Sequence, residues 1–269
     1  MPELPEVETT KRGISPWVSG RTITGVIARR ANLRWPLPDL AHLLPQQQIQ
    51  RVERRAKYLL LHCSNPGTLI IHLGMSGSLR ILPITTTPQK HDHLDIQFGE
   101  QCLRLRDPRR FGAVLWTPSP TTHPLLANLG PEPLSSAFHA DYLWERIRHR
   151  QAPIKNLLMD SKIVVGIGNI YATEALFLAR IHPKRAGQKT TKSMLQDLVQ
   201  SIKTILTQAI EQGGTTLRDF QQENGKPGYF RHQLQVYGRA GDPCTLCQTP
   251  LHTMQIGQRT STYCTQCQH

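Results

Sequence analysis

The chain has 269 residues, 38% hydrophobic and 19% charged, which is enough apolar side chain to exclude wholesale disorder. Its 32 lysines and arginines outnumber 19 acidic residues and give a formal net charge of +13. This excess favours a polyanionic partner, nucleic acid ahead of an anionic membrane, with a basic surface that binds nothing as the alternative.

The sequence predicts a cytoplasmic protein with two domains. No stretch reaches the roughly 20 apolar residues that cross a bilayer, and the opening MPELPEVETTKRG is acidic where a secretion signal is basic. The length exceeds that of most single domains.

The first 117 residues predict one helix followed by short strands. Val7, Lys11 and Ile14 have helical spacing. From about residue 22 onwards, short alternating or apolar runs between Gly, Pro and Asn breaks are typical of an antiparallel sandwich or barrel. These runs are TITGVIA, YLLLHC, TLIIHLG, SLRIL, HLDIQF, CLRLR and AVLW.

The pattern changes after a proline-containing connection at 129–138. From Asp141 to about Gln212 the apolar spacing is helical, and 213–230 is a polar, glycine-rich loop. We therefore expect an α+β protein: an antiparallel β-sandwich with a leading helix (1–131), a helical domain (132–236) and a C-terminal hairpin (237–269). The helical runs are YLWERI, IKNLLMDSKIV, NIYATEALFLARI and MLQDLVQSIKTILTQAI.

Four cysteines near the C-terminus have the spacing of a zinc site. The pattern C-x2-C-x16-C-x2-C suits four thiolates around one tetrahedral ion. An ordinary zinc ribbon that only stabilises the terminus is the alternative, and a redox role is disfavoured because neither pair has a strand-helix context. Arg259 is expected beside the hairpin tip, where it suits a rigid phosphate contact. The four ligands are Cys244, Cys247, Cys264 and Cys267.

The run GIGN at 166–169 precedes a helical stretch. Glycines allow close backbone approach, Asn169 can cap the helix, and the helix start attracts an anion such as a DNA phosphate. The alternative is a plain helix-turn-helix hairpin. A dinucleotide site is discarded because the third glycine and the strand context are missing.

Motifs along the whole chain resemble those of formamidopyrimidine-DNA glycosylases, in the same order. They are MPELPEVET, RRAKYLLL, HLGMSGSLR, HDH at 91–93, DPRRFG, GIGNIY, GKPGYF and the four-cysteine module. The resemblance implies a helix-two-turn-helix (H2TH) motif in the helical domain. Endonuclease VIII-like relatives, which prefer oxidised pyrimidines, typically carry Gly where this chain has Leu4, so the purine-directed branch is favoured.

The resemblance implies four catalytic residues. Pro2, once Met1 is removed, would be a secondary amine that attacks the sugar C1′ and forms an iminium. Glu3 would act as acid and base. Lys57 would hold a phosphate or the damaged base; the alternative is a surface lysine without a catalytic role. Arg259 would grip phosphates beside the lesion.

The resemblance also implies DNA contacts. Met75, Arg109 and Phe111 would fill the space of a flipped-out base, although core packing is the default for Met75 and Phe111. The loop 217–229 would close over that base. The DNA contacts are completed by His91, Asn169 and Arg150, whose surroundings RIRHRQ match the family only loosely.

The resemblance thus implies a monomeric enzyme that excises oxidised purines from double-stranded DNA and then cleaves the strand. One structural zinc ion and no organic cofactor are expected. Two other functions compete: a pyrimidine-preferring glycosylase, and a non-catalytic zinc protein that binds damaged DNA. The joint presence of Pro2, Glu3 and Lys57 argues against the second.

Overall fold

The computed structural model describes residues 2–214 and 230–269, without the side chains of Arg231 and His232. The described chain forms two compact units, one of residues 2–127 and 212–214, the other of 128–211 and 230–269. The boundaries expected at 131/132 and 236/237 stay predictions.

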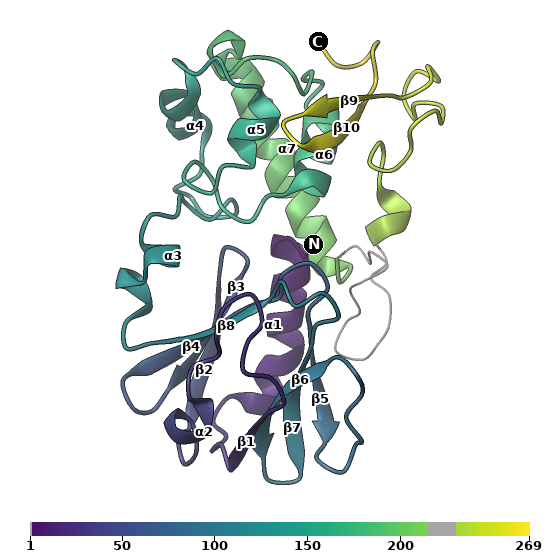
Figure 1. Cartoon of the computed structure of the whole chain (residues 1–269). Coiled ribbons are helices and arrows are strands. Elements are labelled where there is room, and N and C mark those ends of the chain that lie inside the picture. The colour runs from purple at the N-terminus through teal and green to yellow at the C-terminus, as the bar shows by residue number, and fades with distance from the viewer. Residues whose placement is uncertain (1, 215–229) are drawn as a thin grey trace. The chain divides into compact units, whose positions relative to one another are not determined.

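The first unit begins with helix α1 (Leu4–Val18), which runs beside two sheets (Figure 1). Pro5 stands in the first turn, where its missing N–H costs no hydrogen bond. Leu4, Val7, Ile14 and Val18 are buried, so the helix inserts one apolar face into the core. The helix expected from the spacing of Val7 and Ile14 is confirmed.

Eight strands form two four-stranded antiparallel sheets, in the orders β1-β6-β7-β5 and β2-β3-β4-β8. One hydrophobic core collects side chains from α1 and from both sheets, which confirms the sandwich. The strands are β1 (Gly25–Ala28), β2 (Ile49–Arg55), β3 (Tyr58–Cys63), β4 (Gly67–His72), β5 (Ser78–Pro83), β6 (Asp92–Phe98), β7 (Gln101–Arg106) and β8 (Ala113–Thr117).

Strand β2 was not expected from the sequence. Its run IQRVERR has only two apolar residues, Ile49 and Val52, and the pairing with β3 shifts register between Ile49 and Arg51. That irregularity breaks the two-residue period by which strands are recognised. Short helices complete the unit: α2 (Leu40–Leu43), η1 (Pro120–Thr122) and α3 (Pro124–Ala127).

The second unit is helical, with a two-stranded hairpin near its end. Its elements are α4 (Ala140–Ile147), α5 (Ile154–Leu158), α6 (Asn169–Leu178), η2 (Gly187–Lys189), α7 (Lys192–Glu211), η3 (Phe230–Gln233), β9 (His252–Ile256) and β10 (Arg259–Tyr263). Helix α7 packs against α6 and α4, and β10 packs against α6. None of the described helices is both long enough and apolar enough to cross a membrane.

Helix α5 is shorter than the apolar run 154–164 predicts. Asp160 accepts the N–H of Lys162 through Oδ1 over 3.0 Å, and its carbonyl accepts the N–H of Ile163 over 2.9 Å. Such local side-chain bonds compete with the helical ladder. The chain therefore turns after Leu158, while Ile163 stays buried.

Candidate nucleic-acid interface and metal centre

Pro2 and Glu3 stand at the start of α1, and both are buried. The Glu3 N–H donates to Glu6 Oε2 over 2.9 Å, which satisfies one of the amides that a helix start leaves without a helical acceptor. Glu6 is also buried and lies close to Gly214, where an added Cβ would be 2.9 Å from Glu6 Oε1. The helix cap therefore holds the two residues in place.

Lys57 lies in the tight turn between β2 and β3, in which the preceding Ala56 has a φ of 54°. Arg54 donates to Glu8 Oε2 and to the Ala56 carbonyl, each over 2.9 Å. Burial acts to raise the pKa of Glu8, but hydrogen bonds from Lys11 and Arg54 outweigh it and lower the pKa below 4.5. The charged pair ties the turn that carries Lys57 to α1.

Three loops of the first unit meet at one end of the sandwich because of strand register. Arg106, the last residue of β7, pairs both with Ser78, the first of β5, and with Asp92, the first of β6. His72 at the end of β4 likewise pairs with Ala113 at the start of β8. The loops 73–77 and 107–112 therefore cross between the sheets side by side, next to the residues that precede β6.

These loops carry four of the predicted DNA contacts. Phe111 is 46% exposed, which excludes core packing for this residue. The exposed Arg109 places Cζ 5.1 Å from the centroid of the Phe111 ring. Met75 and His91 are partly exposed. The unit thus presents a ring, a cation and a thioether on neighbouring loops.

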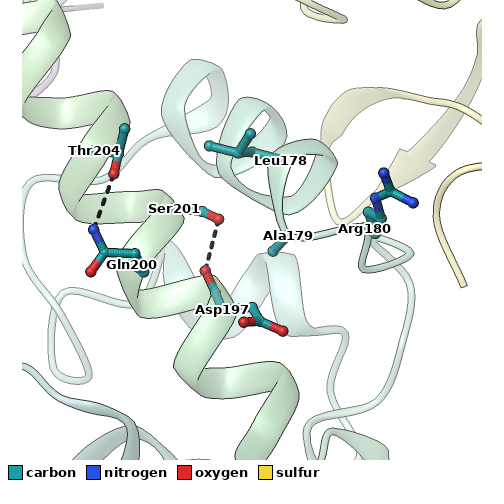
Figure 2. A pocket seen from close by; sticks show the side chains of 7 residues that line it. All are labelled: Leu178, Ala179, Arg180, Asp197, Gln200, Ser201 and Thr204. Carbon is teal, nitrogen blue, oxygen red and sulfur yellow. Dashed lines mark hydrogen bonds between the residues drawn. The ribbon is translucent and has the colours of Figure 1, made fainter. Parts of the chain in front are cut away.

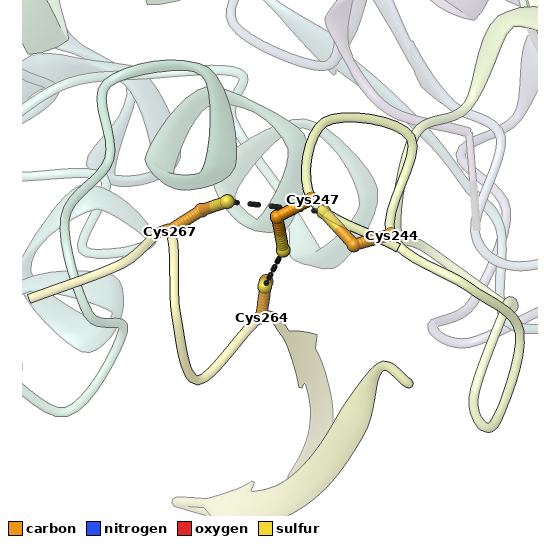
Figure 3. A group of neighbouring side chains, drawn as sticks. All are labelled: Cys244, Cys247, Cys264 and Cys267. Carbon is orange, nitrogen blue, oxygen red and sulfur yellow. Dashed lines mark hydrogen bonds between the residues drawn. The ribbon is translucent and has the colours of Figure 1, made fainter. Parts of the chain in front are cut away.

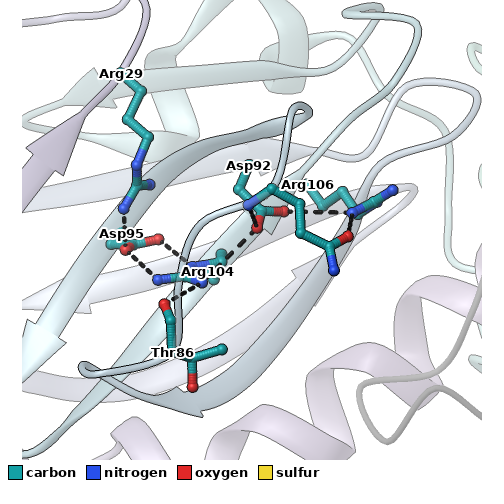
Figure 4. A network of polar contacts seen from close by, with 7 residues as sticks. Arg29, Thr86, Asp92, Asp95, Arg104 and Arg106 are labelled. Atoms are coloured by element: carbon teal, nitrogen blue, oxygen red, sulfur yellow. Dashed lines mark hydrogen bonds and ion pairs between the residues drawn. The ribbon is translucent and has the colours of Figure 1, made fainter.

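Buried ion pairs fix the strand that follows His91 (Figure 4). Arg104 is 2% exposed, and its Nε and Nη2 each donate to Asp95 over 2.8 Å. Oδ2 of Asp92 lies 3.7 Å from Nη1 of Arg104, and Oδ1 of Asp92 lies 3.8 Å from Nη1 of Arg106. Because buried charges are tolerated only when they are paired, the network holds β6 and the loop before it in place.

In the second unit, Asn169 is the first residue of α6, and Gly168 takes the cap position. The expectation that Asn169 caps the helix is wrong, because its Nδ2 donates instead to the Thr260 carbonyl over 3.2 Å. Its Oδ1 is buried without a hydrogen-bond partner in the described part of the chain. Since Thr260 follows Arg259, two predicted phosphate contacts lie close together.

Arg259 is the first residue of β10, directly after the turn at Gly257 and Gln258. Gly257 has a φ of 58°, a backbone conformation that glycine adopts without strain. Arg259 is exposed, but the strand behind it is anchored. The buried Lys155 donates from Nζ to Ser261 Oγ over 2.5 Å and to the Thr260 carbonyl over 3.3 Å.

The four C-terminal cysteines gather at one point (Figure 3), with all four Sγ atoms within 4.8 Å of one another. Sγ of Cys244 lies 3.9 Å from that of Cys267, and Sγ of Cys247 lies 3.4 Å from that of Cys264. A tetrahedral ion with Zn–S bonds of about 2.3 Å needs sulfurs roughly 3.8 Å apart. The cluster therefore fits a zinc ion.

One predicted residue stands apart from these groups. Arg150 is exposed after α4, and within the described residues no hydrogen bond joins its side chain to Asn169 or Arg259. The loop 217–229, which includes Gly225 and Gly228, is expected to close over the flipped base, and the whole of it lies outside the described residues.

In the described part of the second unit, two buried charges escaped the sequence analysis, although each interrupts an apolar helical run. Lys155 is one of them. The other is Glu174, whose carboxylate accepts three consecutive backbone N–H groups; burial raises its pKa. A charge inside an apolar run is the signal that identifies such residues. The donors to Glu174 are Gln235, Val236 and Tyr237, at 2.8, 3.0 and 2.7 Å.

A pocket of about 410 Å³ lies between the end of α6 and the middle of α7 (Figure 2). None of the residues predicted from the sequence lines it. Its hydroxyl and amide groups bond within α7, as Ser201 does to the Asp197 carbonyl over 2.7 Å. The lining residues are Leu178, Ala179, Arg180, Asp197, Gln200, Ser201 and Thr204.

Known proteins match this chain over its whole length. Residues 1–114 match the formamidopyrimidine-DNA glycosylase N-terminal domain, and residues 129–221 match the H2TH domain of the same family. A formamidopyrimidine-DNA glycosylase of Photobacterium damsela subsp. piscicida is 54% identical over 269 residues, which is 100% of both chains.

Solved structures similar to this chain come from the same family as the sequence relatives. The Lactococcus lactis Fpg in complex with DNA containing an abasic site superposes with a TM-score of 0.92 at 32% identity and covers 99% of both chains. A variant of that protein in complex with Fapy-dG-containing DNA also gives 0.92 at 32% identity and covers 100% of both chains. The chain therefore belongs to the formamidopyrimidine-DNA glycosylase family of DNA repair enzymes.

Proposed function

We propose that the chain excises oxidised purines, 8-oxoguanine and formamidopyrimidines, from double-stranded DNA and then cleaves the strand at the emptied site. The observation that carries this proposal is the buried Pro2–Glu3 pair at the start of α1, in a chain of this family. Relatives crystallised with Fapy-dG and with abasic-site DNA support both halves of the proposal.

Pro2 supplies the nucleophile once Met1 has been removed. Its secondary amine attacks the sugar C1′, the bond to the damaged base breaks, and opening of the sugar ring leaves an iminium. A terminal amine has a reference pKa of roughly 7.7 to 8.0, so a modest depression leaves much of it unprotonated at neutral pH. While Met1 is attached, the Pro2 nitrogen is an amide and cannot react in this way.

Glu3 and Lys57 assist around this centre. Glu3 protonates the ring oxygen as the ring opens and then shuttles protons. The iminium acidifies C2′, and loss of that proton expels the 3′ phosphate. A second elimination releases the 5′ phosphate. Lys57 holds a phosphate or the base, and Arg259 grips the phosphates for the second step.

The remaining predicted residues bind the duplex. Met75, Arg109 and Phe111 enter the space that the flipped base leaves, while His91, Asn169 and Arg150 contact the backbone. The four cysteines hold one structural zinc ion, which stiffens the hairpin behind Arg259. No organic cofactor takes part, and the enzyme acts as a monomer in the cytoplasm.

Borohydride trapping on a duplex with 8-oxoguanine opposite cytosine tests this proposal. Protein that begins at Pro2 should form a reduced covalent complex, and mass spectrometry should place the DNA fragment on the peptide that starts with Pro2. Protein with Met1 retained is the matched control: it should bind the duplex and form no complex. A crosslink on Lys57, or normal cleavage by the Met1-retained form, would show that the mechanism is wrong.

The substrate class needs a separate comparison. The rates of cleavage of a thymine glycol duplex and an 8-oxoguanine duplex are compared. If the thymine glycol duplex is cleaved at an equal or higher rate, the chain has the pyrimidine-directed function instead.

A further inference from the structure

Asp107 is a buried carboxylate to which the proposed chemistry assigns no role. It is 0% exposed and stands directly after β7, at the start of the loop that carries Arg109 and Phe111. Its Oδ1 accepts the Ser76 hydroxyl over 2.7 Å, and its Oδ2 accepts the Gly112 N–H over 2.8 Å. One carboxylate thus bonds to both loops that cross between the sheets.

Ser76 extends this connection. Its Oγ accepts the Arg109 N–H over 3.1 Å, so the residue after Met75 holds the backbone of the loop opposite. The Asp107 backbone reaches the third loop, because its N–H donates to the His91 carbonyl over 3.0 Å. Its carbonyl accepts Nε2 of His93, at the start of β6, over 2.9 Å.

The two crossing loops also touch backbone to backbone. Gly74 has a φ of 65°, and a Cβ there would lie 2.4 Å from the Gly112 nitrogen. A Cβ on Gly112 would lie 2.9 Å from Asp107 Oδ2 and 2.9 Å from the His72 carbonyl. Only glycine fits at these two points, so one loop cannot shift without displacing the other.

We propose that Asp107 is a positioning residue which, with Ser76 as relay, locks the two crossing loops so that Met75, Arg109 and Phe111 enter DNA as one rigid unit. This inference rests on the proposed function, in which those three side chains fill the space of the flipped base. Asp107 itself, being fully buried, does not contact DNA.

The relevant readout is insertion rather than catalysis. A duplex with 2-aminopurine opposite a tetrahydrofuran abasic analogue reports loop insertion through fluorescence, and the analogue has no C1′ base to release. The variant Ser76→Ala removes the relay with the smallest change in volume. The variant Asp107→Asn keeps an acceptor for Gly112 and replaces the acceptor of the Ser76 hydroxyl with an amide donor.

Ser76→Ala and Asp107→Asn should each slow the fluorescence change of the duplex by roughly tenfold, the scale expected when a buried group loses its hydrogen-bond partner. The double variant should be little slower than either single one, because residues that act as one unit are not additive. Thr117→Val is the matched control: it removes a buried hydroxyl, bonded to the Ser119 carbonyl over 3.0 Å, from the far end of β8 and should insert normally.

Trapping on a single-stranded abasic oligonucleotide separates positioning from general damage, because no duplex gap has to be filled there. Ser76→Ala should trap it at the wild-type rate. The inference is overturned if wild type, Ser76→Ala and Thr117→Val insert into the duplex at equal rates. It is also overturned if Ser76→Ala slows the single-strand reaction as much as the duplex reaction. Absence of trapping in the wild type would refute the proposed function alone, since the fluorescence signal still decides the role of Asp107.

Discussion

His72 connects the predicted catalytic lysine with the first crossing loop. Its Nδ1 accepts the Gly74 N–H over 3.1 Å, and its cross-strand partner is Tyr58, the residue after Lys57. Burial, with the positive charges of Lys57 and Arg34, lowers its pKa from 6.5 to about 4, against a smaller opposing effect of Asp107. His72 is therefore neutral at pH 7, as its role of acceptor requires.

Protonation of His72 should destabilise the fold in mild acid. Between pH 6.5 and about 4 the unfolded chain binds a proton that the folded protein does not, so this contribution to the free energy of unfolding falls as the pH falls. The slope reaches at most about 1.4 kcal/mol per pH unit. His72→Asn, whose amide oxygen can still accept the Gly74 N–H, should lose this part of the slope.

Urea unfolding at pH 7.0, 5.5 and 4.5 measures the difference between variant and wild type. His42→Asn removes an exposed histidine and serves as control. If the stability of wild type and of His72→Asn changes in parallel with pH, His72 does not titrate as described.

At the scale of elements, the hairpin β9–β10 is held from both ends. Asn169 and Lys155 bond to the strand that carries Arg259, and the cysteines gather where the two strands leave the hairpin. Glu174 on α6 fixes the segment 235–237 that leads into it. A metal ion bound by the cysteines would therefore close a structure that the helices already hold, and its removal should affect the hairpin first.

Zinc removal should reduce DNA binding while the sandwich stays folded. Untreated protein should contain one zinc ion per chain, and chelation should remove it together with most of the affinity for a lesion duplex, because the support behind Arg259 is lost. Elemental analysis measures the zinc content, circular dichroism shows whether the sandwich stays folded, and a binding titration gives the affinity for the lesion duplex. Cys63→Ala, which removes a buried thiol outside the cluster, should keep its zinc. Active, unchelated protein without zinc would contradict the assignment.

At the scale of the whole molecule, the charge of +13 should govern affinity for DNA. Binding of cations to phosphates releases counterions, so the logarithm of the binding constant should fall linearly with log salt, by about 0.9 per phosphate neutralised. Arg259→Ala should reduce this slope by about one unit.

Titrations of lesion duplex at several salt concentrations give the slope. Arg51→Ala makes the same charge change at an exposed arginine that is already paired with Glu53 over 2.7 Å, and its slope should equal that of the wild type. A binding constant that does not change with salt would show that phosphate contacts contribute little.

The sequence by itself determined the family, the sandwich, the main helices and the cysteine cluster. Each of these depends on local features: alternation along a strand, helical spacing, or the four positions of the C-x2-C pairs. It also predicted the catalytic and DNA-contacting residues, whose roles stay predictions. Strand β2 was missed because its register shift at Ile49 and Arg51 removes the local pattern.

Only the tertiary structure decided which residues stand together. The three loops of the first unit meet because Arg106 pairs with both β5 and β6, a consequence of register between strands far apart in sequence. Asp107, Lys155 and Glu174 acquire their roles in the same way, since the partners of a buried charge come from distant segments. Local pattern cannot reveal such partners, because burial and hydrogen bonding are set by packing.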